Sequence, residues 1–132
     1  MKYLMKPLCF LVLAYVSCHT TFAEIAIQET IRTAGSQVNP NIDRKPIPPT
    51  PNNMPLPEFG QQVIAWGTGP EQAKQRYESV NQTDIPILKQ KGVTLAMAKE
   101  WQAFYENEVQ RNPGNPAAFY RAKLMAKIVG MW

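Results

Sequence analysis

The sequence predicts an all-α protein, a small bundle of about four helices that ends in a helical hairpin and follows a disordered, proline-rich tether. Three observations lead to this prediction. Prolines crowd one part of the chain, helix-capping residues recur after it, and apolar residues then repeat every three or four positions. Nothing alternates apolar and polar residues long enough to predict a substantial strand.

Residues 1–23 have the pattern of a cleaved export signal. Lys2 and Lys6 precede an apolar stretch of eleven residues, and small residues stand at the −3 and −1 positions of a cleavage site after Ala23. The stretch is too short to cross a bilayer, which takes about 20 residues as a helix. We therefore predict a periplasmic or secreted protein with no transmembrane span in the mature chain. An uncleaved anchor helix and lipid attachment at Cys18 are the alternatives.

Cleavage would remove the single histidine, His19, and both cysteines, Cys9 and Cys18. Imidazole and thiol groups supply most catalytic bases, metal ligands and covalent nucleophiles near neutral pH. Removing 23 of the 132 residues leaves 109, with twelve Lys and Arg against ten Asp and Glu. Since the basic residues are not clustered, we expect no nucleic-acid partner. We also expect no cofactor and no metal site, because only scattered carboxylates remain.

Residues 24–57 are predicted to form the flexible tether. Seven prolines lie between Pro40 and Pro57, where they fix φ and remove hydrogen-bond donors. Such a stretch favours extended, partly polyproline II backbone. A short amphipathic helix over Glu24 to Arg32, with three isoleucines, would precede it. The tether is predicted to act as a spacer, with docking in an aromatic groove of a partner as the alternative.

Residues 58–132 are predicted to form the helical domain. Phe59 to Trp66 fits one short strand or an extended lead-in segment. The first helix would begin at Thr68-Gly69-Pro70-Glu71, where Thr and Glu have capping-box spacing, and run to about Val80. A short second helix would begin at Thr83 or Asp84 and end at Lys91-Gly92, where glycine supplies a left-handed C-cap.

Two longer helices complete the predicted domain. Thr94 caps the first, Leu95 to Arg111, whose apolar side chains recur at three- and four-residue steps. Asn112-Pro113-Gly114 ends it, and Asn115-Pro116 begins the last helix, which runs to about Met131. So short a connection predicts an antiparallel hairpin.

Several of these segments together resemble a known family. These segments are WGTGP at 66–70, GVT at 92–94 followed by Met97-Ala98 and Trp101, and RNPGNP at 111–116. The pattern, over about Leu56 to Val129, resembles an uncharacterised bacterial family of small secreted proteins common in Acinetobacter-like organisms. A similar module occurs in large polymorphic-toxin or Rhs-type proteins. The resemblance implies an association with toxins or secretion systems and implies no particular reaction.

Two groups of residues are candidates for binding. The turn at Trp66, Thr68 and Gly69 precedes a helix N-terminus, where free N–H groups favour anions. A structural turn that seats Trp66 in the core is the favoured interpretation. The second group surrounds the hairpin loop and could bind a carboxylate or phosphate. Its members are Arg111, Asn112, Asn115 and Arg121. Helix capping and hairpin locking are the favoured interpretation of these residues.

The candidates for catalysis are Glu106 and Glu108, with Arg121 within reach across the hairpin. Glycosidases use two carboxylates, one with a raised pKa. Solvation of an exposed helix face is the simpler interpretation. The sequence therefore favours a secreted envelope protein that acts as a non-enzymatic binding or adaptor module, with an envelope or secretion-system protein as partner. The alternatives are an effector enzyme acting on peptidoglycan through carboxylate chemistry and a toxin–immunity partner.

Overall fold

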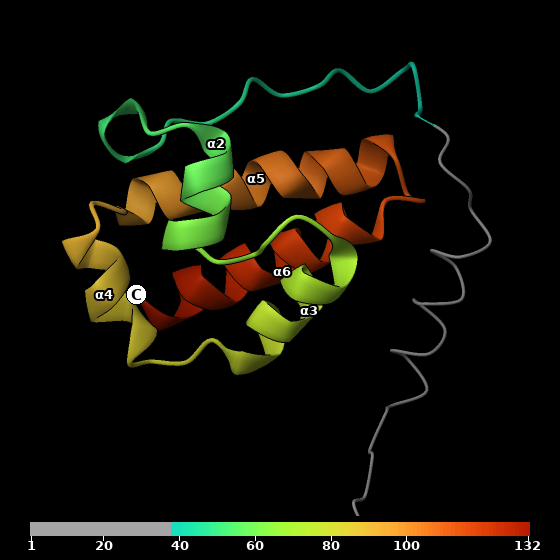
Figure 1. The fold of residues 1–132 in the computed structure, drawn as a ribbon. Helices are drawn as coiled ribbons and strands as arrows, with labels where there is room; N and C mark the ends of the chain where they lie inside the picture. Colours follow the sequence, from blue (N-terminus) through green and yellow to red (C-terminus); the bar gives the residue numbers. More distant parts are fainter. Residues whose placement is uncertain (1–37) are drawn as a thin grey trace, which may run out of the picture.

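The computed structural model describes residues 38–132, and this part of the chain is helical without a strand. The all-α prediction is confirmed (Figure 1). The predicted export signal, and the predicted helix over Glu24 to Arg32, lie outside the described residues. The four expected helices correspond to α3 (Pro70–Ser79), α4 (Asp84–Gln90), α5 (Leu95–Arg111) and α6 (Pro116–Met131).

Helices α5 and α6 form the predicted antiparallel hairpin, with both N-caps where the sequence placed them. The Thr94 hydroxyl accepts a hydrogen bond from the Met97 amide at 3.1 Å. The Asn115 side chain accepts one from the Ala118 amide at 3.3 Å. Each bond satisfies a backbone donor that the first helical turn leaves free. Local capping therefore fixes the N-terminal ends of the two longest helices.

The shorter helices begin differently from the capping prediction. The Thr68–Glu71 capping box is not formed, because the Gln72 side chain accepts from the Thr68 amide at 2.6 Å. Before α4, the Thr83 hydroxyl donates to the Asn81 side-chain oxygen at 2.6 Å, and Thr83 makes no side-chain cap. The left-handed glycine at the end of α4 is confirmed, since Gly92 has φ of 92°.

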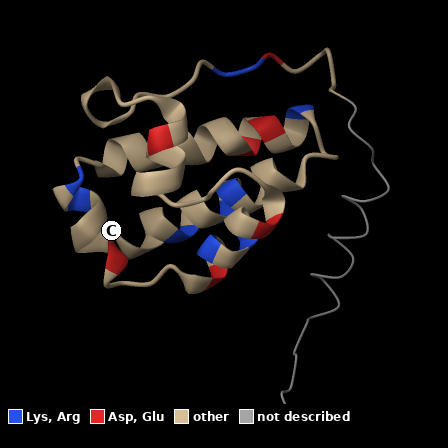
Figure 2. Cartoon of the chain, in the orientation of Figure 1, with Lys and Arg blue, Asp and Glu red and all other residues tan. Residues whose placement is uncertain are grey.

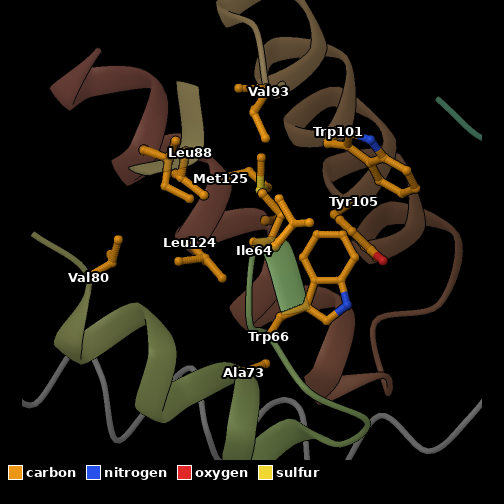
Figure 3. Close-up of a cluster of buried hydrophobic side chains, with 14 of the residues drawn as sticks. Ile64, Trp66, Ala73, Val80, Leu88, Val93, Trp101, Tyr105, Leu124 and Met125 are labelled. Carbon is orange, nitrogen blue, oxygen red and sulfur yellow. The ribbon is translucent and has the colours of Figure 1, made fainter. Parts of the chain in front are cut away.

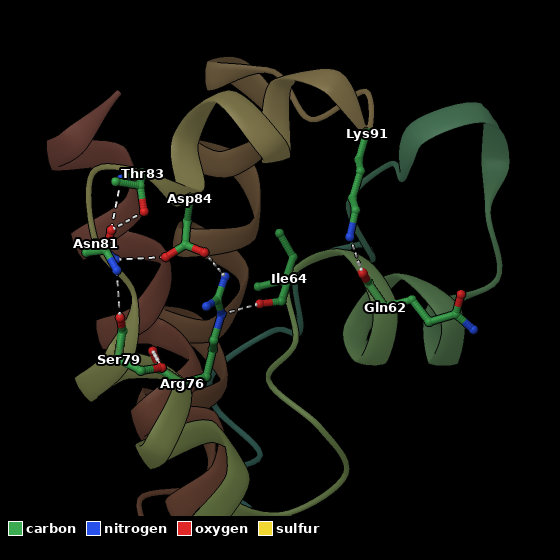
Figure 4. A network of polar contacts seen from close by, with 8 residues as sticks. All are labelled: Gln62, Ile64, Arg76, Ser79, Asn81, Thr83, Asp84 and Lys91. Carbon is green, nitrogen blue, oxygen red and sulfur yellow. Dashed lines mark hydrogen bonds and ion pairs between the residues drawn. The ribbon is translucent and has the colours of Figure 1, made fainter.

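A polar network joins α3, α4 and the segment before α3 (Figure 4). The Arg76 Nε donates to the Ile64 carbonyl at 2.9 Å, and its Nη2 contacts the Asp84 carboxylate at 3.2 Å. Lys91 donates to the Gln62 carbonyl at 2.7 Å. Charge-assisted bonds of this kind hold an otherwise irregular chain segment against two helices.

The segment that was expected to be a strand or extended is helical as far as Val63. Phe59–Val63 form the π-helical turn η2, and the chain before it forms the 3₁₀ turn η1 (Pro51–Asn53) and α2 (Leu56–Glu58). Phe59, Val63 and Ile64 are all buried, and a helical turn points side chains at these spacings into one core. The strand interpretation was wrong because eight residues of mixed polarity do not distinguish the two periods.

The core lies between residues 59–66, helices α3 and α4, and the α5–α6 hairpin (Figure 3). Trp66 belongs to this core, with 3% of its surface exposed. Its ring centroid lies 5.5 Å from that of Phe59, 5.5 Å from that of Trp101 and 5.2 Å from that of Tyr105. Aromatic pairs at these separations add to the stability gained from area burial. The turn at Trp66 therefore seats the indole in the core.

Residues 38–50, the N-terminal arm, differ from the predicted tether because they pack along α5. The Asn107 side chain donates to the Asp43 carbonyl at 3.1 Å and accepts from the Lys45 amide at 2.9 Å. Farther along, the Trp101 indole donates to the Pro49 carbonyl at 3.0 Å. Prolines remove backbone donors, but their carbonyls still accept, and α5 supplies the donors from its side chains.

Candidate functional site

Arg121 of α6 points into the junction between the hairpin and the Trp66 turn. Its guanidinium carbon lies 5.4 Å from the Trp66 ring centroid and 5.6 Å from that of Tyr105. Its Nη2 donates to the Gly67 carbonyl at 3.3 Å, and its Nη1 lies 3.5 Å from the Tyr105 hydroxyl. Within residues 38–132 it forms no ion pair. Aromatic faces and a carbonyl thus hold this cation.

The expected contact of Arg121 with Glu106 or Glu108 is not formed. Glu108 instead accepts from Arg111 at 2.8 Å and from Arg44 of the N-terminal arm at 3.1 Å. The Glu106 carboxylate accepts a hydrogen bond from the Gln102 side-chain amide at 2.8 Å. The structure therefore does not bring the three candidate catalytic residues together around one reaction centre.

Burial raises the pKa of the Tyr105 hydroxyl above its ordinary value of 10.0. The Arg121 guanidinium opposes this shift, because a nearby cation favours the phenolate. The desolvation effect is the larger of the two. Tyr105 is therefore neutral at physiological pH and contributes a hydroxyl and a ring face to the Arg121 environment.

The turn residues Trp66, Thr68 and Gly69 connect η2 to α3. Gly67 has φ of 68°, in the left-handed region that glycine adopts without strain. The Gln72 side-chain oxygen accepts a hydrogen bond from the Thr68 backbone amide at 2.6 Å and another from the Thr68 hydroxyl at 3.1 Å. One of the backbone donors that was expected to bind an anion is thus already bonded.

The hairpin-loop residues bond mainly to backbone groups. Arg111 donates from its Nε to the Ile42 carbonyl at 3.2 Å, and its own carbonyl accepts from the Asn39 amide at 2.6 Å. The Asn112 amide donates to the Glu108 carbonyl at 2.9 Å. Together with the Asn115 cap, these bonds close the hairpin and fix the start of the N-terminal arm to the end of α5.

An open groove of ≈ 380 Å³ runs between α5 and α6, and we call it the α5–α6 groove. It is lined by Glu106, Val109, Gln110, Phe119, Ala122, Lys123 and Ala126. The carboxylate comes from one helix and the ammonium from the other. Most of this lining was missed at the sequence level, although the spacing of Phe119, Ala122 and Ala126 marks a second apolar stripe on α6.

Lys123 is held at one wall of this groove by aromatic rings. Its ammonium lies 4.7 Å from the Tyr77 ring centroid and 5.4 Å from that of Phe119. Helix α6 contains three cations and no acidic residue (Figure 2). In the described range, none of those cations forms an ion pair with a carboxylate. The helix therefore presents uncompensated positive charge beside an apolar surface.

Two features are absent from residues 38–132. In that range no three His, Cys, Asp or Glu side chains lie close enough to hold a metal ion. None of its helices combines the length and apolar character that membrane crossing requires.

Residues 34–132 match the family described as "Domain of unknown function (DUF4951)". A solved structure, "NMR structure of the protein from Acinetobacter baumannii", shares 50% sequence identity. The alignment covers 76% of this chain and 95% of that one, with a TM-score of 0.63. No curated protein matches this chain. Because the family match spans most of the sequence, the chain belongs to the DUF4951 domain family.

Proposed function

We propose that this chain is an exported binding module of the bacterial envelope, without catalytic activity of its own. Its partner would be an envelope or secretion-system protein that inserts an amphipathic helix into the α5–α6 groove. The mixed lining of that groove is the observation that supports the proposal. Apolar side chains of both helices would receive the anchors of the partner helix, as in other helix-in-groove complexes.

The charges at the groove would give the interaction its orientation. Glu106 stands on α5, and Lys123 stands on α6 without a carboxylate partner in the described residues. Complementary charges at an interface contribute to register and association rate more than to affinity. A partner helix with an acidic residue beside its apolar anchors fits this arrangement best.

The binding proposal is tested by photo-crosslinking the exported chain in envelope extracts. We expect one partner to be captured by the wild-type chain and lost in Phe119→Asp, because a carboxylate would enter the apolar groove. Ile87→Asp is the matched control, since Ile87 lies on α4 and is 49% exposed. Circular dichroism checks that both variants are folded. Equal capture by Phe119→Asp and Ile87→Asp would show that the groove is not the binding site.

The export proposal is tested separately by cell fractionation and intact mass. We expect the protein in the periplasm or the medium, with Glu24 as its first residue. A mass that includes an acylated Cys18 would identify a lipid-anchored form, and a chain that still begins at Met1 would contradict cleavage.

The two alternative functions, a peptidoglycan enzyme and a toxin–immunity partner, predict different results. An enzyme acting on peptidoglycan would release muropeptides, and Glu106→Gln or Glu108→Gln would stop the release. The ion pairs of Glu108 with Arg44 and Arg111 support a structural role for that carboxylate instead. A toxin–immunity partner would rescue cells from the toxicity of a neighbouring gene product.

A further inference from the structure

We propose that residues 24–32 of the same chain occupy the α5–α6 groove while no partner is bound. A partner would then have to displace them, so that the protein regulates its own binding site. This inference rests on the proposed function, because both segments would use one groove. Three observations support it: the place where the described chain begins, the chemistry of residues 24–32, and the charges at the groove.

The described chain begins beside one end of the groove. The Asn39 amide donates to the Arg111 carbonyl at 2.6 Å, at the last turn of α5 (Figure 1). Val109 and Gln110, one turn or less before this point, line the groove. Residues that precede Val38 therefore join the structure within one helical turn of the groove.

The intervening chain is long enough to reach every part of the groove. Ile31 and Val38 are separated by seven residues, which span up to about 23 Å when extended. The groove lining on α6, from Phe119 to Ala126, extends along only about 10 Å of helix. Because the connection is short and intramolecular, docking would benefit from an effective concentration in the range of about 1 mM.

Residues 24–32 have the apolar side chains that the groove would accept. Ile25, Ile27 and Ile31 are the only large apolar residues between Glu24 and Gln37. Opposite them, the groove contains Val109 and Phe119, which remain partly exposed. Docking would remove both sets of apolar surface from water, which is the main driving force for such contacts.

The charges of the two surfaces are complementary. Lys123 lacks a carboxylate partner within residues 38–132, and Glu29 stands between two isoleucines in the sequence. Arg32 would supply a cation for Glu106, which within residues 38–132 accepts a hydrogen bond from the Gln102 side-chain amide. Each charge of the groove thus has an opposite charge in the segment.

Disulfide trapping tests the docking directly, since the chain from Glu24 onward contains no cysteine. We compare Gln28→Cys paired with Ala126→Cys against Gln28→Cys paired with Ala96→Cys. Both alanines are exposed on helices, but only Ala126 lines the groove. We expect the Ala126 pair to form an intramolecular disulfide about tenfold faster, because docking concentrates the two thiols. Equal rates, or disulfides that link two chains, would overturn the proposal.

Charge reversal provides a second test, in which rescue by a second substitution distinguishes a lost contact from a loss of folding. Lys123→Glu should slow trapping of the Ala126 pair, and adding Glu29→Lys should restore the rate. Failure of this rescue would overturn the assigned contact. The two proposals are distinguishable, because the crosslinking test of the groove uses a partner and this test does not. Trapping without partner capture would refute the binding function alone, and capture without trapping would refute the self-docking alone.

Discussion

Gly60 lies where the π-helical turn passes under the Trp66 indole, and this close approach allows a sharp stability prediction. A Cβ atom at position 60 would lie 2.9 Å from Trp66 Cε2 and still closer to Nε1. The indole cannot move away easily, because the rings of Phe59, Trp101 and Tyr105 surround it. Gly60→Ala should therefore force a rearrangement of the aromatic side chains in the core.

The size of the effect follows from two opposing contributions. Overpacking a dense core costs about 1–3 kcal/mol. Replacing glycine by alanine in helical backbone returns roughly 0.5–1 kcal/mol. Because the overlap is severe and the neighbours are rigid, we expect the free energy of unfolding to fall by about 1.5 kcal/mol. At about 4 °C per kcal/mol, the melting temperature should drop by about 6 °C.

Urea unfolding followed by tryptophan fluorescence measures this change. Gly130→Ala is the matched control, because Gly130 is in α6 and a Cβ there meets nothing within 4 Å. This control should be stabilised by roughly 0.5 kcal/mol, since only the helix propensity changes. If Gly60→Ala is as stable as Gly130→Ala, the indole is not confined as described and the packing argument is wrong.

Four further predictions concern single side chains. Asn107→Ala removes both hydrogen bonds that this residue makes to the N-terminal arm and should cost about 2 kcal/mol. Hydrogen exchange should then accelerate in the arm but not in the hairpin, and uniform acceleration would contradict a separately held arm. Because burial raises the pKa of Tyr105, the folded state keeps the phenolic proton to higher pH than the unfolded state does. The associated stability is complete below pH 10.0 and falls as pH rises through the folded-state pKa, so Tyr105→Phe should lose this dependence in urea unfolding. Arg121→Met should raise the pKa of Tyr105 further, as measured by ultraviolet titration. An unchanged pKa would show that Arg121 does not act on the Tyr105 hydroxyl. Asn115→Ala removes the cap of α6 and should cost about 1 kcal/mol by urea unfolding, with little change counting against the cap.

The parts of the fold that the sequence predicts are those controlled by neighbouring residues. The bounds of α5 and α6 follow from Thr94, from Asn112-Pro113-Gly114 and from Asn115-Pro116. Caps and breakers act within a few residues, so their effect can be deduced without a fold. The start of α3 was less predictable, because Glu71 and Gln72 both lie close to Thr68 in the sequence and it is Gln72 that forms the bond.

The unpredicted features depend on contacts between distant residues. Asn107 bonds to backbone 62 and 64 residues away, and nothing in the sequence marks the proline-rich segment as its partner. Arg121 bonds to Gly67 rather than to Glu108, although the glutamate is much closer along the chain. The N-terminal arm already provides Arg44 for that glutamate. Such choices depend on the packed arrangement and not on local spacing.

The attachment of the N-terminal arm has a mechanical consequence. The arm runs antiparallel to α5, from Asn39 at Arg111 to Pro49 at Trp101. Its hydrogen bonds to α5 therefore follow one another along the helix. Tension applied to the N-terminal end and directed away from α5 would load the Asn39 bond first and reach the Pro49 bond last. The arm would peel off by stages under small forces, and the helices behind it would carry load only after it had detached.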